Sequence, residues 1–344
     1  METTEPLVLE RPKPNPEWLA LVREDSLDPS LPIIDPHHHL WDRPDRSYRL
    51  DDLLDDLACG HNIVATVFVE CSSEYRKDGP VQMQPVGETE FVVGAAEEAA
   101  RRSLGTRVCA GIVGHIDLAG ERVDEVLEAH IAAGRGRFRG IRHITARHQA
   151  LAWTGNKPPP PPGLMADPTF RAGFARLAKH RLSFDAWLYH HQLGELLDLA
   201  GEFPETPIVI DHVGGPLGVG PYKGRLDEVY GAWLTAMRQL SQRPNVHVKL
   251  GGLGMVSGGF TFHQRPAPPS STDLARTWAP WIDACIQMFG ADRCMFESNF
   301  PVDKAMYSSG VMWNAFKRLT MGASSDERRA LFHNTAARFY RLSP

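Results

Sequence analysis

Short apolar runs and longer amphipathic segments alternate along most of this chain. The runs are rich in Val and Ile and stop at Gly, Pro or a polar residue, which is typical of buried strands. The segments between them carry apolar residues at helical spacing. The pattern therefore predicts eight strands, each followed by a helix, within residues 31–41, 63–71, 108–117, 138–145, 182–191, 207–212, 246–250 and 293–299.

Eight strand–helix units predict an α/β fold, a (β/α)8 TIM barrel. The alternative, a doubly wound open sheet, would place its ligand loops at one switch point. Here polar residues instead recur near the carboxyl end of almost every predicted strand: His37, His39, Glu70, His115, Arg142, His143, Tyr189, His190, His212, Lys249 and Asn299. Because TIM barrels carry their active sites at that face, we predict a site there.

The chain divides into a short arm and one domain. Residues 1–30 are rich in Pro, Glu and Asp and form an arm that wraps over the surface, contacts a neighbouring subunit or is disordered. Residues 31–344 form the single barrel domain. The long loop at 146–168 contains five consecutive prolines, which suit neither helix nor strand, and it is predicted to form a lid or rim.

Composition narrows the class of protein. The chain has 344 residues, 42% of them hydrophobic, and a net charge of −5, which argues against a nucleic-acid-binding protein. No apolar run suits a signal peptide or a membrane span, so we expect a cytoplasmic protein without membrane contact. The five cysteines follow no framework spacing and are read as reduced thiols.

The first predicted strand carries three consecutive histidines. Side chains alternate along a strand, so His37 and His39 are expected on one side, with Ile33 and Asp35, and His38 on the other. Two neighbouring neutral imidazoles suit a divalent metal or an oxyanion.

Five stretches together resemble the amidohydrolase superfamily, in its amidohydrolase-related branch of metal-dependent hydrolases and lactonases. That branch includes enzymes like fuconolactonase and 2-pyrone-4,6-dicarboxylate lactonase. The stretches are Ile-Asp-Pro-His-His-His-Leu-Trp (34–41), Gly-Ile-Arg-His (140–143), Val-Ile-Asp-His-Val-Gly (209–214), Val-His-Val-Lys-Leu (246–250) and Phe-Glu-Ser-Asn-Phe-Pro (296–301). The resemblance implies that His37 and His39 bind a metal or polarise a carbonyl. It also implies that His212 is a ligand or a proton-transfer group. Strand parity supports an inward His212, because Ile208 and Ile210 would share its face.

The eighth strand departs from this resemblance. These families normally have Asp in the sequence Gly-Ser-Asp-Trp-Pro, whereas Asn299 stands here, and an amide cannot act as a general base. We hypothesise that Asn299 orients substrate or water while Glu297 or Asp303 supplies the carboxylate. Burial would raise the pKa of Glu297. The alternatives are a lost activity, or a structural ion pair of Glu297 with Arg142 or Lys249.

The sequence leaves metal binding open. A catalytic zinc or manganese ion needs three protein ligands, which His37, His39 and one of His190, His191 or His212 would supply. Parity cannot decide between His190 and His191. In the metal-free alternative, cationic side chains and the histidines polarise a lactone carbonyl and stabilise its oxyanion.

The remaining candidates define the substrate. Arg142, Lys249, Glu70 and Tyr189 are predicted to bind it and Trp41 to form a pocket wall; the basic groups suggest an anionic small molecule. We predict a hydrolase that opens a lactone or similar cyclic ester of a carboxylated or sugar-derived compound with activated water. The alternatives are a metal-dependent decarboxylase and a barrel that only binds a ligand. A homodimer is expected from symmetry statistics alone.

Overall fold

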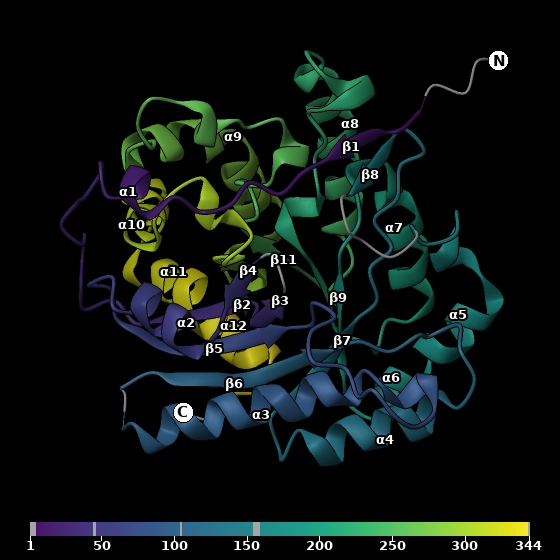
Figure 1. The fold of residues 1–344 in the computed structure, drawn as a ribbon. Coiled ribbons are helices and arrows are strands. Elements are labelled where there is room, and N and C mark those ends of the chain that lie inside the picture. The colour runs from purple at the N-terminus through teal and green to yellow at the C-terminus, as the bar shows by residue number, and fades with distance from the viewer. Residues whose placement is uncertain (1–4, 44–45, 104, 154–158, 343–344) are drawn as a thin grey trace.

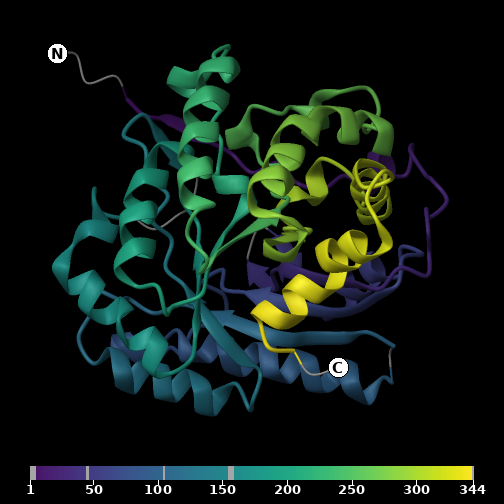
Figure 2. The same cartoon turned by 180° about the vertical axis from the view of Figure 1, so that it is seen from behind.

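Eight parallel strands form a nearly closed barrel, which confirms the predicted TIM-barrel fold (Figures 1 and 2). The structure, a computed structural model, describes residues 5–43, 46–103, 105–153 and 159–342. The sheet order is β12-β11-β10-β9-β7-β6-β5-β2. The two outermost strands meet through a parallel bridge between His38 and Phe300, and the backbone N–H of His39 donates to the Phe300 carbonyl at 2.8 Å.

All eight strands fall inside or close to the predicted runs, but most end earlier than expected. Their bounds are β2 Ile33–His38, β5 Ile63–Val69, β6 Arg107–Gly114, β7 Phe138–Arg142, β9 Ser183–Ala186, β10 Ile208–Ile210, β11 Val246–Leu250 and β12 Cys294–Phe296. Short strands β3 Trp41–Arg43 and β4 Arg46–Tyr48 form an antiparallel pair after β2. The helix that follows this pair begins only at Leu50.

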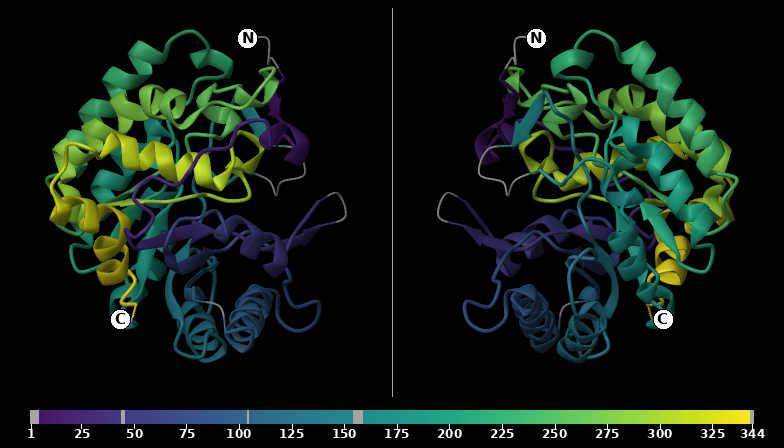
Figure 3. Two further views of the ribbon diagram at one scale, coloured as in Figure 1. Left: turned by 90° about the vertical axis from the view of Figure 1, so that its left-hand side faces the viewer. Right: turned by 90° about the vertical axis from the view of Figure 1, so that its right-hand side faces the viewer.

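The helices lie on the outside of the barrel, as in Figure 3, where α3 and α4 run side by side below the sheet. Their bounds are α2 Leu50–Leu57, α3 Val86–Arg101, α4 Val123–Ala133, α5 Pro168–Phe174, α6 Arg176–Lys179, α7 Leu193–Glu202, α8 Leu226–Leu240, α9 Ser271–Phe289, α10 Ser309–Leu319, α11 Ser325–Arg329 and α12 Thr335–Phe339. A π-helical turn, Ala330–Asn334, lies between α11 and α12. None of the helices in the described ranges is long and apolar enough to cross a membrane.

Two apolar layers pack against the barrel sheet. Inside the barrel lie Ile34, Ala65, Val67, Val69, Val113, Val209 and Met295, together with Tyr340 and Leu342 from the C-terminal segment. Outside it, Ile208 and Ile210 pack with Trp233 and Met237 of α8. The prediction that Ile208 and Ile210 face the barrel interior with His212 is therefore wrong. The residue of β10 that faces the barrel interior is Val209, between these two isoleucines.

The N-terminal arm lies against the barrel and crosses its surface from β1 to α1 (purple in Figure 1). Strand β1, Leu7–Leu9, pairs in parallel with β8, Leu151–Trp153, from the long loop after β7. Helix α1, Pro16–Leu19, follows, and the Trp18 indole donates to the Arg265 carbonyl at 3.0 Å. The loop at 146–168 therefore pairs with the arm; the first proline of its run lies outside the described residues.

Candidate active site

The strand-1 histidines reach the site through an irregularity in β2. Its register with β5 shifts between Asp35 and His38, so one extra residue is accommodated and His37 turns inward. His38 points away, with Nε2 2.9 Å from Thr66 Oγ1. The rings of His37 and His39 lie 5.0 Å apart, so the predicted separation of these two from His38 is confirmed. The expectation that Ile33 shares their face is wrong, because Ile33 packs in the outer layer.

His212 enters the site because the chain leaves β10 just before it. His212 has φ 54° and Val213 φ 47°, a left-handed turn that aims both Asp211 and His212 at the barrel axis. The His212 ring lies 4.6 Å from the His37 ring. Gly252, with φ +66°, passes so close that a Cβ there would lie 2.4 Å from the His212 ring. Only glycine fits that position.

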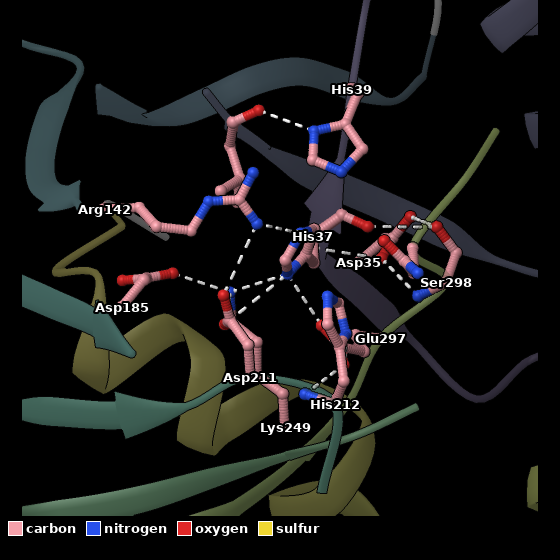
Figure 4. A network of polar contacts seen from close by, with 12 residues as sticks. Asp35, His37, His39, Arg142, Asp185, Asp211, His212, Lys249, Glu297 and Ser298 are labelled. Carbon is pink, nitrogen blue, oxygen red and sulfur yellow. Dashed lines mark hydrogen bonds and ion pairs between the residues drawn. The ribbon is translucent and has the colours of Figure 1, made fainter. Parts of the chain in front are cut away.

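Glu297 links the two histidines (Figure 4). Its Oε1 lies 2.7 Å from His212 Nδ1 and accepts from the His212 backbone N–H at 3.0 Å. Its Oε2 lies 2.8 Å from His37 Nδ1. Burial acts to raise the pKa of Glu297, but the two imidazoles outweigh it and lower the pKa to about 2. The expected raised pKa is therefore wrong, and the ion pairs of Glu297 among described residues are with the two histidines.

A buried ionic network lies beside these three residues (Figure 4). Lys249 Nζ lies 2.6 Å from Asp185 Oδ2, 3.1 Å from Asp211 Oδ1 and 3.1 Å from His37 Nδ1. Burial alone would lower the pKa of Lys249, but the two carboxylates raise it above its ordinary value. The ammonium is therefore charged, and fully enclosed at 0% exposure.

Arg142 joins the network from β7. Its Nε donates to Glu70 Oε1 at 2.9 Å, and its NH1 lies 3.3 Å from His37 Nε2 and 3.5 Å from Asp211 Oδ2. Both nitrogens of His37 therefore face charged groups. Carboxylates accompany both cations: Glu70 pairs with Arg142, and Asp185 and Asp211 pair with Lys249, so His37 lies in a network in which the positive charges are balanced.

The tip of the eighth strand forms a separate hydrogen-bonded unit. The Asn299 amide donates to Asp303 Oδ1 at 3.0 Å, and Asp303 Oδ2 accepts from Gly254 N at 3.0 Å and Tyr307 O–H at 2.7 Å. Burial raises the pKa of Asp303 to about 6, so the carboxylate is ionised at neutral pH. Asp303 therefore holds the amide of Asn299 in one orientation.

Three more predicted site residues, Trp41, Tyr189 and His190, lie around this centre or away from it. Trp41 stacks on His39 with ring centroids 5.9 Å apart. Tyr189, buried at 2% exposure, accepts from the Trp153 indole at 2.9 Å. The structure does not bring His190 to His37, because β9 ends before it. His190 lies in a short 3-10 turn and Leu217 N donates to its Nδ1 at 3.4 Å. Strand alternation therefore cannot be used to choose between His190 and His191, because both lie beyond the end of β9.

Two buried carboxylates were missed as site residues. Asp185 lies inside an apolar run with the parity of the inward residues of β9, and that charge in a buried strand was an available signal. Its second partner is the Tyr340 hydroxyl, at 2.7 Å. Asp211 directly precedes His212, and strand parity assigned it to the wrong side. Neither pairing with Lys249 is visible in the sequence.

The residues present fit a divalent metal. Ligand atoms of His37, His212 and Glu297 lie within 4.8 Å of one another, all buried. Glu297 Oε2 makes no hydrogen bond of good geometry within the described chain. Two imidazoles and one carboxylate are a donor set that catalytic zinc accepts. His39 is not in this group of three, and its Nδ1 lies 2.7 Å from the Val69 carbonyl.

Comparison with known proteins decides the family. Residues 34–342 match the sequence profile described as Amidohydrolase. The chain belongs to the amidohydrolase family. Over 335 residues it is 34% identical to the uncharacterized protein y4mH of Sinorhizobium fredii, covering 91% of this chain and 99% of that protein. It is 28% identical to an L-fucono-1,5-lactonase of Burkholderia ambifaria, covering 90% and 95%.

Solved structures of amidohydrolases share the same barrel. A zinc-bound amidohydrolase from Burkholderia multivorans superposes with a TM-score of 0.70 at 25% identity, covering 90% of this chain and 99% of that one. A manganese complex of 5-carboxyvanillate decarboxylase from Novosphingobium aromaticivorans gives 0.58 at 13% identity, covering 93% and 99%. The second likeness shows the fold alone. This protein is therefore a TIM-barrel hydrolase of the amidohydrolase family with a metal-compatible centre.

Proposed function

We propose that this enzyme opens a lactone or similar cyclic ester of a small molecule, with water as the nucleophile. The observation that carries the proposal is the buried centre of His37, His212 and Glu297 beside two cations. The relatives support the same chemistry, since the L-fucono-1,5-lactonase of Burkholderia ambifaria matches 90% of the chain. An ester carbonyl needs an electrophile and a group that accepts a proton from water, and this centre contains candidates for both.

Arg142 stabilises the charge that develops on the carbonyl oxygen, whereas Lys249 is enclosed beside Asp185 and Asp211 and positions His37. Arg142 and Lys249 both contact His37, and burial strengthens their electrostatic effect. His37, His212 and Glu297 would hold a zinc or manganese ion, which would polarise the carbonyl and lower the pKa of a bound water. His39 contacts the edge of the His37 ring, with centroids 5.0 Å apart, and helps to orient it.

His212 and Asn299 act on the water. Glu297 engages His212 Nδ1, so Nε2 is the nitrogen that faces the reacting centre, either as a ligand or as the acceptor of the water proton. Asn299 orients substrate or water through its amide, and Asp303 fixes that amide. Glu297 is itself a weak base because its pKa is so low, so its role is to position the two imidazoles.

Residues around the reacting centre are assigned to substrate binding. Glu70 positions Arg142, and Trp41 and Tyr189 form aromatic walls above the centre. We propose an anionic small-molecule substrate, a cytoplasmic location and a homodimer. Light scattering on the purified protein tests the dimer directly.

The test combines elemental analysis with lactone turnover. Purified enzyme is assayed for zinc and manganese and, with a pH indicator, for proton release from L-fucono-1,5-lactone and L-rhamnono-gamma-lactone. We expect turnover in the wild type, its loss in His212→Asn, and retention in His191→Asn, which removes an imidazole at the rim. A folded wild type that opens no lactone above the spontaneous rate, or that releases CO2 from aromatic carboxylates instead, would overturn the proposal.

A further inference from the structure

The barrel closes where β2 meets the end of β12, and this junction is held differently from the others. Every other pair of neighbouring barrel strands is joined by a ladder, whereas among the described residues β2 and β12 share one isolated bridge, between His38 and Phe300. Two backbone hydrogen bonds accompany that bridge: His39 N donates to the Phe300 carbonyl at 2.8 Å and Asn299 N to the His37 carbonyl at 2.9 Å. The main chain therefore joins these two strands over only a few residues.

The side chain of Asp35 connects the two strands a second time (Figure 4). Its Oδ1 accepts from the backbone N–H of Ser298 at 2.9 Å and from that of His37 at 3.3 Å. Its Oδ2 accepts from the Ser298 hydroxyl at 2.6 Å. Asp35 is buried at 3% exposure, so these bonds form in a low-dielectric surrounding, where they are stronger than in water.

Ser298 extends the connection to the residues on either side of it. Its Oγ lies 3.2 Å from the His37 carbonyl oxygen and accepts from the Phe300 backbone N–H at 3.1 Å. Asn299, between Ser298 and Phe300, has φ 55°, a left-handed conformation that persists only where the surrounding structure holds it. The pair of Asp35 and Ser298 provides that support, because it binds the N–H groups before and after Asn299.

Residues of the candidate centre lie on both sides of this junction. His37 belongs to β2, whereas Glu297 and Asn299 directly follow β12. The contact between His37 Nδ1 and Glu297 Oε2, at 2.8 Å, crosses from one strand to the other. A shift of β2 against β12 would therefore change the distance between two of the three residues that fit a metal.

We propose that Asp35 is a positioning residue of the active site. It acts through Ser298 and the backbone of His37, and it sets the distance between His37 and Glu297 and the place of the Asn299 amide. The effect on turnover rests on the proposed lactonase function. The effects on metal affinity and on the junction itself do not.

Removal of the carboxyl group tests this role. In Asp35→Ala we expect kcat for L-fucono-1,5-lactone to fall about tenfold to a hundredfold, since displacing a reacting group by about 1 Å costs about a hundredfold in rate. KM should change little, because Asp35 acts on the position of other groups. Kd for zinc, measured by competition with a coloured chelator, should rise about tenfold or more, as is typical when a group that orients metal ligands is lost. Asp35→Asn should restore most of both values, because its amide oxygen still accepts from the two backbone N–H groups.

Asn245→Ala is the matched control. The Asn245 amide donates to the carbonyls of Ala200, Phe203 and Thr206, so its loss also frees backbone groups, but at the amino end of β11. We expect Asn245→Ala to lower the urea midpoint while kcat and Kd for zinc stay at the wild-type values. Equal losses of kcat and zinc affinity in Asn245→Ala and Asp35→Ala would overturn the proposal, and so would wild-type values in Asp35→Ala.

A milder variant covers the case in which Asp35→Ala does not fold. Ser298→Ala removes only the hydroxyl part of the pair. We expect kcat and zinc affinity to fall about threefold to tenfold, the equivalent of one hydrogen bond. Unchanged values in a folded Ser298→Ala would overturn the proposal as well.

A failure of the lactonase function gives a different result. If no lactone is opened, zinc affinity and hydrogen–deuterium exchange still test the junction. In Asp35→Ala or Ser298→Ala we expect the backbone amides of residues 297–301 to exchange faster than in the wild type, while those of β9 and β10 keep their rates. Unchanged exchange at residues 297–301 would refute the role of Asp35 whatever the substrate is.

Discussion

Removal of the buried ammonium at the barrel centre should destabilise the protein strongly. In Lys249→Met, the side chain keeps nearly its length but loses its charge, so the carboxylates of Asp185 and Asp211 are left facing each other in a fully enclosed space. Breaking a buried ion pair by removing one partner costs about 3–5 kcal/mol. Asp185 would keep the Tyr340 hydroxyl and Asp211 the Arg142 guanidinium at 3.5 Å, so we expect a loss within that range, about 3–5 kcal/mol.

A second substitution should recover part of this loss. In Lys249→Met with Asp185→Asn, one of the two stranded charges is gone, and the amide can still accept from the Tyr340 hydroxyl that now contacts Asp185. Coupling between contacting residues in one network is about 0.5–3 kcal/mol, and we expect recovery of that size.

Urea unfolding followed by fluorescence gives the free energies for wild type, both single variants and the double variant. Arg225→Met is the control, because it breaks an exposed pair with Glu228 and should leave the unfolding midpoint unchanged. A loss below about 1 kcal/mol in Lys249→Met would refute the reasoning, since it falls well short of the cost of a stranded buried charge. So would a double variant that is less stable than Lys249→Met alone.

Two further substitutions probe how the site is held. Asp303 must be ionised to accept from Asn299, Gly254 and Tyr307, so kcat should fall as the pH drops through about 6, where Asp303 protonates. Asp303→Asn should lower kcat about tenfold or more and flatten that limb of the pH profile, whereas an unchanged profile would contradict the role of Asp303. Gly252→Ala would place a Cβ 2.4 Å from the His212 ring, and displacing a catalytic group by about 1 Å costs about a hundredfold in rate. Full lactonase activity in Gly252→Ala would contradict the requirement for glycine at this position, where φ is +66°.

Much of the fold could be predicted because several barrel strands, such as β10 and β12, are continuous apolar runs. A parallel strand covered on both faces is apolar throughout, so its existence is easily recognised while its two faces look alike. This is why the eight strands were found and the inward side of β10 was not. Ile208 and Val209 are equally apolar, and only the packing against α8 distinguishes them.

The site residues could be found more easily than their geometry. His37, His212 and Glu297 were all candidates, and the structure brings them together. Their arrangement depends on a register shift in β2 and a left-handed turn at His212, which break strict alternation. The parity rule assumes regular pleating, so it fails where strands end, which is where barrel sites lie.

The parallel pairing of β1 with β8 has a practical consequence for work on this protein. A purification tag fused ahead of Leu7 would join the chain directly before β1, which pairs with β8 (Figure 1). It would add residues next to the register that sets Leu9 opposite Trp153, whose indole donates to Tyr189. A tag at the other end would follow Tyr340 and Leu342, which pack inside the barrel, and Tyr340 donates to Asp185. Screens for the natural substrate should therefore use protein from which the tag has been removed.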